Sequence, residues 1–154
     1  MTNIIQFTDP FSRGSAISED SYPIAVSKVA SQLEALTSLQ PNWDSYNAKP
    51  PSTNALLGAI QLASYTFQIT TPTPDVFPTP NGNIQFEWSI CNYDIEIEIE
   101  SGSKCIVSYM DLNADNEWKE KTLTTNLAML TNLIKELTRR YVDEFESKSS
   151  ENVA

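Results

Sequence analysis

The chain has 154 residues, 40% of them hydrophobic and 10% aromatic, which is typical of one compact domain with a sizeable core. Lys and Arg total 10 against 20 Asp and Glu, and the formal net charge of -10 disfavours nucleic acid or an anionic membrane as partner. The sequence contains no His, which excludes Ser-His-Asp and Cys-His catalysis and most catalytic zinc sites. We therefore expect no cofactor.

The N-terminus lacks a basic region, and its apolar run at residues 4–7 is too short for a signal peptide, so we expect a soluble, cytoplasmic protein. No segment approaches the roughly 18 consecutive apolar residues of a membrane helix. Cys91 and Cys105 lack the spacing of a metal site, which favours two reduced thiols. Residues 1–20 predict a loosely attached arm, in which residues 4–7 could dock as a short strand.

Two amphipathic helices are predicted before residue 70. The first follows an N-cap at Ser21, has Pro23 in its first turn, and ends near Leu39 ahead of Pro41. Its apolar face comprises Val26, Val29, Leu33 and Leu36. Ser52 is expected to cap the second helix. The apolar face of that helix comprises Leu56, Leu57, Ile60, Ala63 and Phe67. Two adjacent helices of this kind predict a helical hairpin.

Four prolines between residues 70 and 83 predict an extended connector ending in a turn, with an edge strand at 75–79 at most. Strict alternation of apolar and polar residues then predicts two half-buried strands. A two-residue turn at Cys91 and Asn92 brings the apolar residues of both strands onto one face. The expected pairs are Trp88 with Ile95, Phe86 with Ile97, and Ile84 with Ile99.

A three-residue turn at 101–103 extends the same face to a third strand. The expected pairs are Ile99 with Cys105, Ile97 with Val107, and Ile95 with Tyr109. This register holds Cys91 too far from Cys105 for a disulfide. Residues 118–123 predict a fourth strand. Thr124 or Thr125 is expected to cap a third helix that reaches Tyr141, before a flexible acidic tail at 143–154. The order α-α-β-β-β-(β)-α predicts an α+β domain at 21–142, an antiparallel meander of three to four strands with helices on one face.

The outward face of this predicted sheet is acidic. The alternation places on it Glu87, Asp94, Glu96, Glu98 and Glu100, together with Ile106 and Met110. Glu87 is expected opposite Glu96, a destabilising like-charge pair. The face is either a solvated surface partly neutralised by Lys119 and Lys121, or a docking surface for a basic protein. Catalysis by two of the carboxylates would need a pocket that raises a pKa, whereas these positions predict exposure.

Residues 111–117 space oxygen ligands as the start of a calcium loop does. The pattern departs from that loop at Asn116, where Gly is required, and at Thr122, where Glu is required. It also follows a predicted strand instead of a helix. A turn rich in Asn and Asp is equally typical of a strand connection, and no metal is expected.

The most distinctive short stretch joins the first two helices. Asn42-Trp43-Asp44-Ser45-Tyr46-Asn47-Ala48 resembles the Asn-Trp-Asp-Gly-Tyr-Gly-Ala signature of small uncharacterised bacterial proteins, as do Pro78-Thr79-Pro80 and Glu87-Trp88. The resemblance spans residues 42 to about 100, departs at Ser45 and Asn47, and implies a shared fold without an activity. From the residues alone, Asp44 is expected to close an Asx-turn. Trp43 and Tyr46 either pack against the helices or form a recognition patch with Asp44.

These patterns predict a non-catalytic binding protein of the inhibitor, antitoxin or immunity type, which masks a basic protein partner with its acidic sheet face. The recognition patch at Trp43, Asp44 and Tyr46 is the second candidate surface. Two alternatives remain: a structural or adaptor subunit of a larger assembly, and a small hydrolase that uses carboxylates alone.

Overall fold

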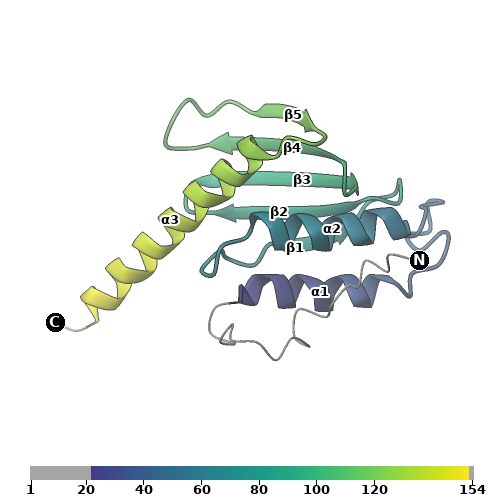
Figure 1. The fold of residues 1–154 in the computed structure, drawn as a ribbon, viewed down its shortest axis with the longest axis horizontal. Coiled ribbons are helices and arrows are strands. Elements are labelled where there is room, and N and C mark those ends of the chain that lie inside the picture. Colours follow the sequence, from purple (N-terminus) through teal and green to yellow (C-terminus); the bar gives the residue numbers. More distant parts are fainter. Residues whose placement is uncertain (1–21, 153–154) are drawn as a thin grey trace, which may run out of the picture.

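The computed structural model describes residues 22–152 and shows an α+β domain in which three helices cover one face of a five-stranded sheet (Figure 1). The predicted arm and the predicted cap at Ser21 lie outside the described residues. The elements are α1 Ile24–Leu36, α2 Thr53–Thr66, β1 Asp75–Pro78, β2 Ile84–Ile90, β3 Tyr93–Ser101, β4 Lys104–Asp111, β5 Lys119–Leu123 and α3 Ala128–Glu151. The strands lie in chain order and every neighbouring pair is antiparallel. The predicted fold class is confirmed, and β1 is the edge strand that raises the count to five.

The predicted strand register is confirmed at both turns. Cys91 and Asn92 form the two-residue turn with φ values of 54° and 57°, the left-handed conformation that a tight hairpin turn of this type requires. Trp88 pairs with Ile95, and Ile95 pairs with Tyr109 on the next strand. A register irregularity between residues 99 and 101 accommodates the turn into β4. The inward-facing side chains of β2 and β3 are buried from Ile84 to Trp88 and from Tyr93 to Ile99, whereas Ile90 at the end of β2 is 38% exposed.

The packing face of helix α2 only partly matches the predicted one: Ala63 and Phe67 are buried and Leu56 and Ile60 are partly buried against the core, but smaller residues make the closest contact with the sheet. Its buried residues are Ala55, Gly58, Ala59, Leu62, Ala63 and Thr66, whereas Leu57 is 40% exposed. A Cβ atom on Gly58 would lie 2.4 Å from the backbone carbon of Ser101, so the helix approaches β3 too closely for any side chain there. Because α2 lies so close to β3, the residues at the contact are small. The spacing of apolar residues along the helix does not predict this. The predicted cap is confirmed, because Ser52 Oγ accepts a hydrogen bond from Ala55 N at 3.0 Å.

Helices α1 and α2 lie side by side and antiparallel (Figure 1), as a helical hairpin does. Helix α1 ends at Leu36, before the predicted Leu39, and its N-cap is Pro23. The end comes early because the Thr37 hydroxyl and backbone N–H both bond to Glu34 O, which closes the last turn. The loop between the two helices is therefore longer than predicted.

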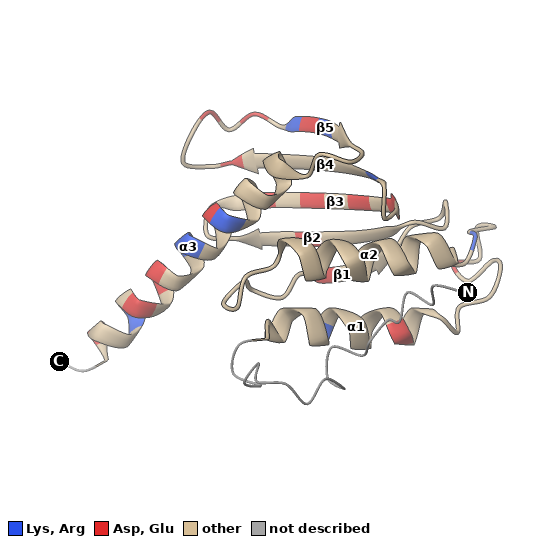
Figure 2. Ribbon diagram, in the orientation of Figure 1, with Lys and Arg blue, Asp and Glu red and all other residues tan. Residues whose placement is uncertain are grey.

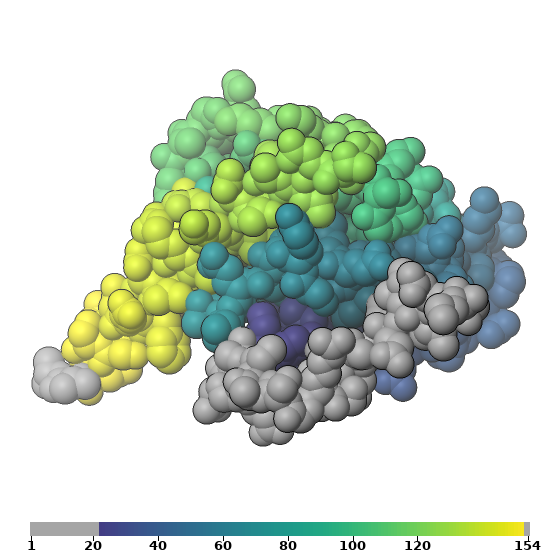
Figure 3. All heavy atoms as spheres, in the orientation of Figure 1, coloured from purple at the N-terminus to yellow at the C-terminus, as the bar shows by residue number. Residues whose placement is uncertain are grey.

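Helix α3 packs beside α2 over the sheet (Figure 3) and projects beyond it at the C-terminal end (Figure 1). Neither Thr124 nor Thr125 caps it; Asn126 Oδ1 accepts from Ala128 N instead. The helix continues to Glu151, past the tail boundary expected at 143, through residues with good helix propensity. None of the helices within residues 22–152 is long and apolar enough to cross a membrane.

Both cysteines are buried and carry free thiols, as predicted. Burial raises the pKa of Cys105 to about 11, so its thiol stays protonated at neutral pH. The pKa of Cys91 is also raised, first by burial and then by the nearby Glu144 carboxylate. Since the thiolate is the reactive form, both groups are suited to packing and neither to nucleophilic chemistry.

Candidate functional site: the outward face of the sheet

Acidic residues from four of the five strands line up on the face turned away from the helices, and β4 contributes a serine to the same line. The register places Asp75 beside Glu87, Glu87 beside Glu96, Glu96 beside Ser108, and Ser108 beside Glu120. We call Asp75, Glu87, Glu96 and Glu120 the acidic row. The three helices all bury their apolar residues in the core on the other side, and Figure 2 marks the acidic positions of β3 in red. Within residues 22–152 no helix covers the row.

The remaining predicted acidic residues lie on the same face. Asp94, Glu98 and Glu100 occupy alternate positions of β3, with Met110 beside Asp94 and Ile106 beside Glu98 on β4. Both of these apolar side chains are half-buried. The structure therefore brings together every sheet residue that the alternation predicted for a docking surface.

The predicted neutralisation by lysines is wrong. Lys119 and Lys121 pair with Tyr109 and Val107, so both point to the side of the sheet that carries the helices. Glu120 instead lies beside Ser108, which makes the outward face more acidic than predicted. Leu123 is the one buried residue of β5. Because side chains alternate along a strand, Lys121 and Lys119 face the same side as Leu123, and Glu120 faces outward.

The carboxylates on this face differ in whether they have a hydrogen-bond or ion-pair partner nearby. Glu98 accepts a hydrogen bond from Asn83 Nδ2 at 3.0 Å, and Glu100 forms a 3.0 Å ion pair with Lys104. Glu96 has no hydrogen-bond or ion-pair partner among residues 22–152. Its pKa is raised, first by partial burial and then by the charges of Glu87 and Asp94. The centre of the acidic row is therefore strained electrostatically and open to a cation.

A hollow of about 280 Å³ opens at one end of the acidic row. Its lining residues are Glu96, Ser108, Trp118, Lys119 and Glu120. Ser108 is a short residue between two long ones, and its hydroxyl donates to Glu120 Oε2 at 3.4 Å. The Trp118 side chain is 53% exposed. Sequence reasoning missed Asp75, Trp118 and Glu120, although the alternation of 118, 120 and 122 would have placed two of them once the β5 register was known.

The loop between α1 and α2 is held by its own polar groups. Asp44 Oδ1 accepts from Tyr46 N at 2.8 Å and from Ala48 N at 3.1 Å, which confirms the predicted Asx-turn. Trp43 is half-buried and donates through Nε1 to Lys49 O at 2.8 Å. Tyr46 is 89% exposed, so the prediction that it packs against the helices is wrong. The bonds made by Asp44 and Trp43 hold the loop, and the Tyr46 ring is left in solvent.

The same loop contacts the turn that precedes β2. Lys49 N donates to Pro80 O and Ser52 N donates to Gly82 O, each at 2.9 Å. Ser45 and Asn47 both have a φ of 66°, in the left-handed region that favours glycine. These are the two positions at which the bacterial signature carries glycine. The stretches that resemble the signature at residues 42–48 and 78–80 are thus neighbours in space.

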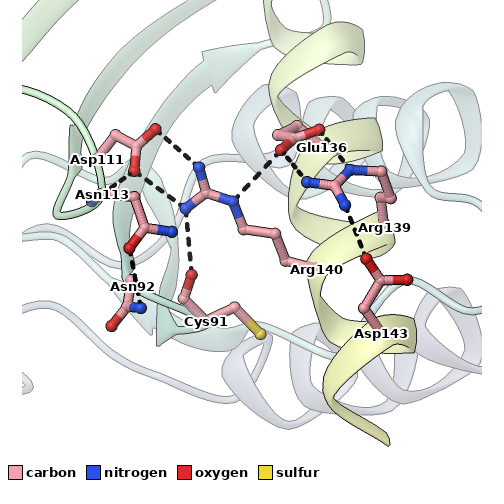
Figure 4. Close-up of polar contacts among 8 residues, drawn as sticks. All are labelled: Cys91, Asn92, Asp111, Asn113, Glu136, Arg139, Arg140 and Asp143. Carbon is pink, nitrogen blue, oxygen red and sulfur yellow. Dashed lines mark hydrogen bonds and ion pairs between the residues drawn. The ribbon is translucent and has the colours of Figure 1, made fainter. Parts of the chain in front are cut away.

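A second charged region, the arginine cluster, is formed by Arg140, Asp111, Glu136 and the carbonyl of Cys91 (Figure 4), together with the Tyr93 ring. Arg140 binds both carboxylate oxygens of Asp111, at 3.0 and 2.8 Å. Its guanidinium lies 3.8 Å from the centre of the Tyr93 ring. Hydrogen bonding from Arg140 lowers the pKa of Asp111. The cluster ties α3 to the β2–β3 turn and to the end of β4.

The arginine cluster also bears on the calcium-like spacing at residues 111–117. Asp111 would be the first ligand of such a loop, and its carboxylate is committed to Arg140. Within residues 22–152, no group of three or more His, Cys, Asp or Glu side chains is arranged to hold a metal ion. No family model, curated protein or solved structure matches the chain. Function therefore has to be inferred from the surface chemistry.

Proposed function

We propose that the protein is a non-catalytic binding module that masks a basic surface of a partner protein, as inhibitors, antitoxins and immunity proteins do. The observation that carries the proposal is the acidic row, which crosses the whole sheet on a face that no described helix covers. Like charges on adjacent strands repel one another and destabilise the free protein. A basic partner would remove that repulsion on binding.

The composition of the face supports the same interpretation. Half-buried Ile106 and Met110 lie beside the carboxylates, so the face offers apolar contact as well as charge. Docking surfaces commonly combine the two, because apolar contact contributes affinity while complementary charge increases association rate and specificity. The net charge of -10 would attract a basic partner over longer distances.

The carboxylate-only hydrolase alternative has less support. The acidic row lies on an open sheet face, and the hollow at its end is lined by two glutamates that flank a serine. Catalytic acids need an enclosed site that excludes water and separates the pKa values of the two groups. An open face with repeated like charges is better suited to a protein surface than to a small substrate.

The adaptor-subunit alternative is favoured by one observation. The projecting half of α3 exposes Tyr141 and Phe145, which continue the apolar stripe that Ile134 and Leu137 bury in the core. An apolar stripe of this kind is typical of a helix that packs against another subunit. Binding through it would be insensitive to salt, whereas binding through the acidic row would weaken steeply with salt.

The proposal is tested by capture and kinetics with a matched pair of variants. The double variant Glu87→Gln and Glu96→Gln removes two charges from the row. The control Glu146→Gln and Glu151→Gln removes two charges from α3. We expect a captured partner to associate about tenfold more slowly with the first variant at low salt, and at an unchanged rate with the control. Stopped-flow association at two ionic strengths measures this. Unchanged kinetics in the row variant, with binding lost in Trp43→Ala, would move the interface to the helix-connecting loop.

A further inference from the structure

The hollow beside Trp118 exists because of the side-chain sizes in the acidic row. Ser108 lies on β4 between Glu96 on β3 and Glu120 on β5. Neighbouring strands are about 4.8 Å apart, so the two glutamate backbones are separated by roughly 10 Å. The short serine leaves the space between them empty, and the Trp118 side chain forms part of its wall.

The lining of this hollow has the chemistry of a receptor for a single cation. Two carboxylates come from the strands on either side of Ser108, the serine hydroxyl lies between them, and the exposed Trp118 side chain lines the hollow. Glu96 has no polar partner within residues 22–152, and Glu120 makes only the 3.4 Å contact with Ser108. Carboxylates bind cations by charge-assisted hydrogen bonds, and a tryptophan face attracts cations further.

The nearby cationic groups of the chain are directed elsewhere. Lys119 lines the hollow through part of its length, but its ammonium pairs with Asp115 at 2.8 Å and lies over the Tyr109 ring on the other side of the sheet. Lys121 pairs across the strands with Val107 and points to that same side. Lys104 is held by Glu100 at 3.0 Å. None of these groups completes the site, so within residues 22–152 the hollow has no cation of its own.

We infer that the hollow receives an arginine side chain of the partner, with the guanidinium between Glu96 and Glu120 and stacked on Trp118. This inference rests on the proposed function and names the anchor of that interface. A guanidinium is planar, donates from both edges, and stacks on an aromatic ring, whereas an ammonium is compact and more strongly hydrated. Binding sites of this kind concentrate affinity in one buried arginine surrounded by weaker contacts.

The test uses three short peptides as probes: Gly-Arg-Gly, Gly-Lys-Gly and Gly-citrulline-Gly, each with blocked ends. Citrulline keeps the shape of arginine without its charge. We expect the arginine peptide to shift the NMR signals of the Trp118 indole N–H and the Ser108 amide in a saturable manner. The lysine peptide should bind about fivefold more weakly, and the citrulline peptide should produce no saturable shift.

Matched variants locate the binding. Glu120→Gln should weaken the arginine peptide about tenfold, and Glu98→Gln, which makes the same charge change on the same face outside the hollow, should weaken it less than twofold. Trp118→Ala should abolish the preference for arginine over lysine, and Trp118→Phe should restore part of it. Because Trp118 and Glu120 are both exposed, these variants are expected to keep the fold, which amide spectra verify.

The outcomes separate this inference from the proposed function. Equal weakening by Glu120→Gln and Glu98→Gln, or equal affinity for arginine and lysine peptides, overturns the anchor while leaving a generally acidic docking face. Absence of any shift in the hollow, with partner association still slowed by Glu87→Gln and Glu96→Gln, likewise overturns the anchor alone. If partner association is also independent of those carboxylates, the proposed function is overturned as well.

Discussion

The acidic row and the arginine cluster use the same side chains in opposite ways. In the arginine cluster, Asp111 and Arg140 are 19% and 13% exposed and bind each other through two hydrogen bonds. In the acidic row, Glu96 has two acidic neighbours, and its pKa is shifted upward, whereas that of Asp111 is shifted downward. The arginine cluster lowers its electrostatic free energy within the chain, whereas the acidic row retains a repulsion that no cationic side chain within residues 22–152 neutralises at Glu96.

The comparison distinguishes carboxylates that stabilise the fold from carboxylates that remain free for the proposed binding. A paired, partly buried carboxylate stabilises the native state and is costly to disturb. An unpaired carboxylate on a solvated face contributes little to stability, because water and salt screen it, but it stays available to a partner.

The largest effect on stability is expected from Arg140→Ala. The change leaves Asp111 without its cation, removes the contact with Cys91 O, and uncovers the Tyr93 ring. We expect the free energy of unfolding to fall by about 2 kcal/mol, measured by urea denaturation. The control is Arg139→Ala, whose ion pairs with Glu136 and Asp143 are exposed; because solvent screens these pairs, its effect on stability should be far smaller than that of Arg140→Ala. Equal losses in both variants would contradict the contrast.

A smaller, pH-dependent effect is expected from Asp111→Asn. The pKa of Asp111 in the folded protein lies below its ordinary value of 3.8, so the ionised form is stabilised by folding. This stabilisation is fully present above that ordinary value and is lost as the pH falls through the folded pKa. We therefore expect the variant to be about 1 kcal/mol less stable than wild type at pH 7 and the difference to shrink as the pH falls below 3.8. A difference independent of pH would contradict the ion pair.

The opposite sign is expected for Glu96→Gln. The folded pKa of Glu96 lies above its ordinary value of 4.5, so the charged form is destabilised by folding, and the penalty disappears as the pH falls below that value. At pH 7 the variant should be unchanged or more stable by about 0.3 kcal/mol, because solvent screening keeps the repulsion small. Thermal unfolding at pH 7 and pH 3 measures the difference. A clear loss of stability at pH 7 would mean that Glu96 has a stabilising partner.

The smallest effect on stability is expected from Tyr46→Ala. The ring is 89% exposed, and the loop is held through Asp44 and backbone groups, so the melting temperature should change by less than about 1 °C. Asp44→Ala is the matched comparison and should destabilise the loop, because two backbone N–H groups lose their acceptor. A stable Tyr46→Ala variant that binds the partner poorly would make the loop part of the interface.

Local regularity explains which parts of the fold were predictable. The alternation of Ile95, Ile97 and Ile99 with acidic residues determines which side chains face the core, and two short turns transmit the same register to the neighbouring strands. The outward-facing residues of β2, β3 and β4, which carry the proposed docking surface, followed from this register. The alternation in β5 was mixed, so the burial of Leu123 and the outward position of Glu120 were not evident.

Contacts between distant segments account for what was missed. The buried face of α2 depends on how closely β3 approaches Gly58, and the apolar period of the helix carries no information on that distance. The Trp118 hollow depends on which strand lies next to Ser108. Neither feature can be predicted from the pattern of residues that are close together in the sequence.

The α+β class, the order and register of the central strands, and the acidic character of their outward side chains could be predicted from local sequence patterns, because each follows from the spacing of apolar residues and from turn length. The pairing of Arg140 with Asp111, 29 residues away, and the lack of a partner for Glu96 within residues 22–152 depend on contacts between distant segments. The number of charged residues alone does not distinguish a paired carboxylate such as Asp111 from an unpaired one such as Glu96. The three-dimensional arrangement determined which carboxylates are neutralised within the fold and which remain exposed to another molecule.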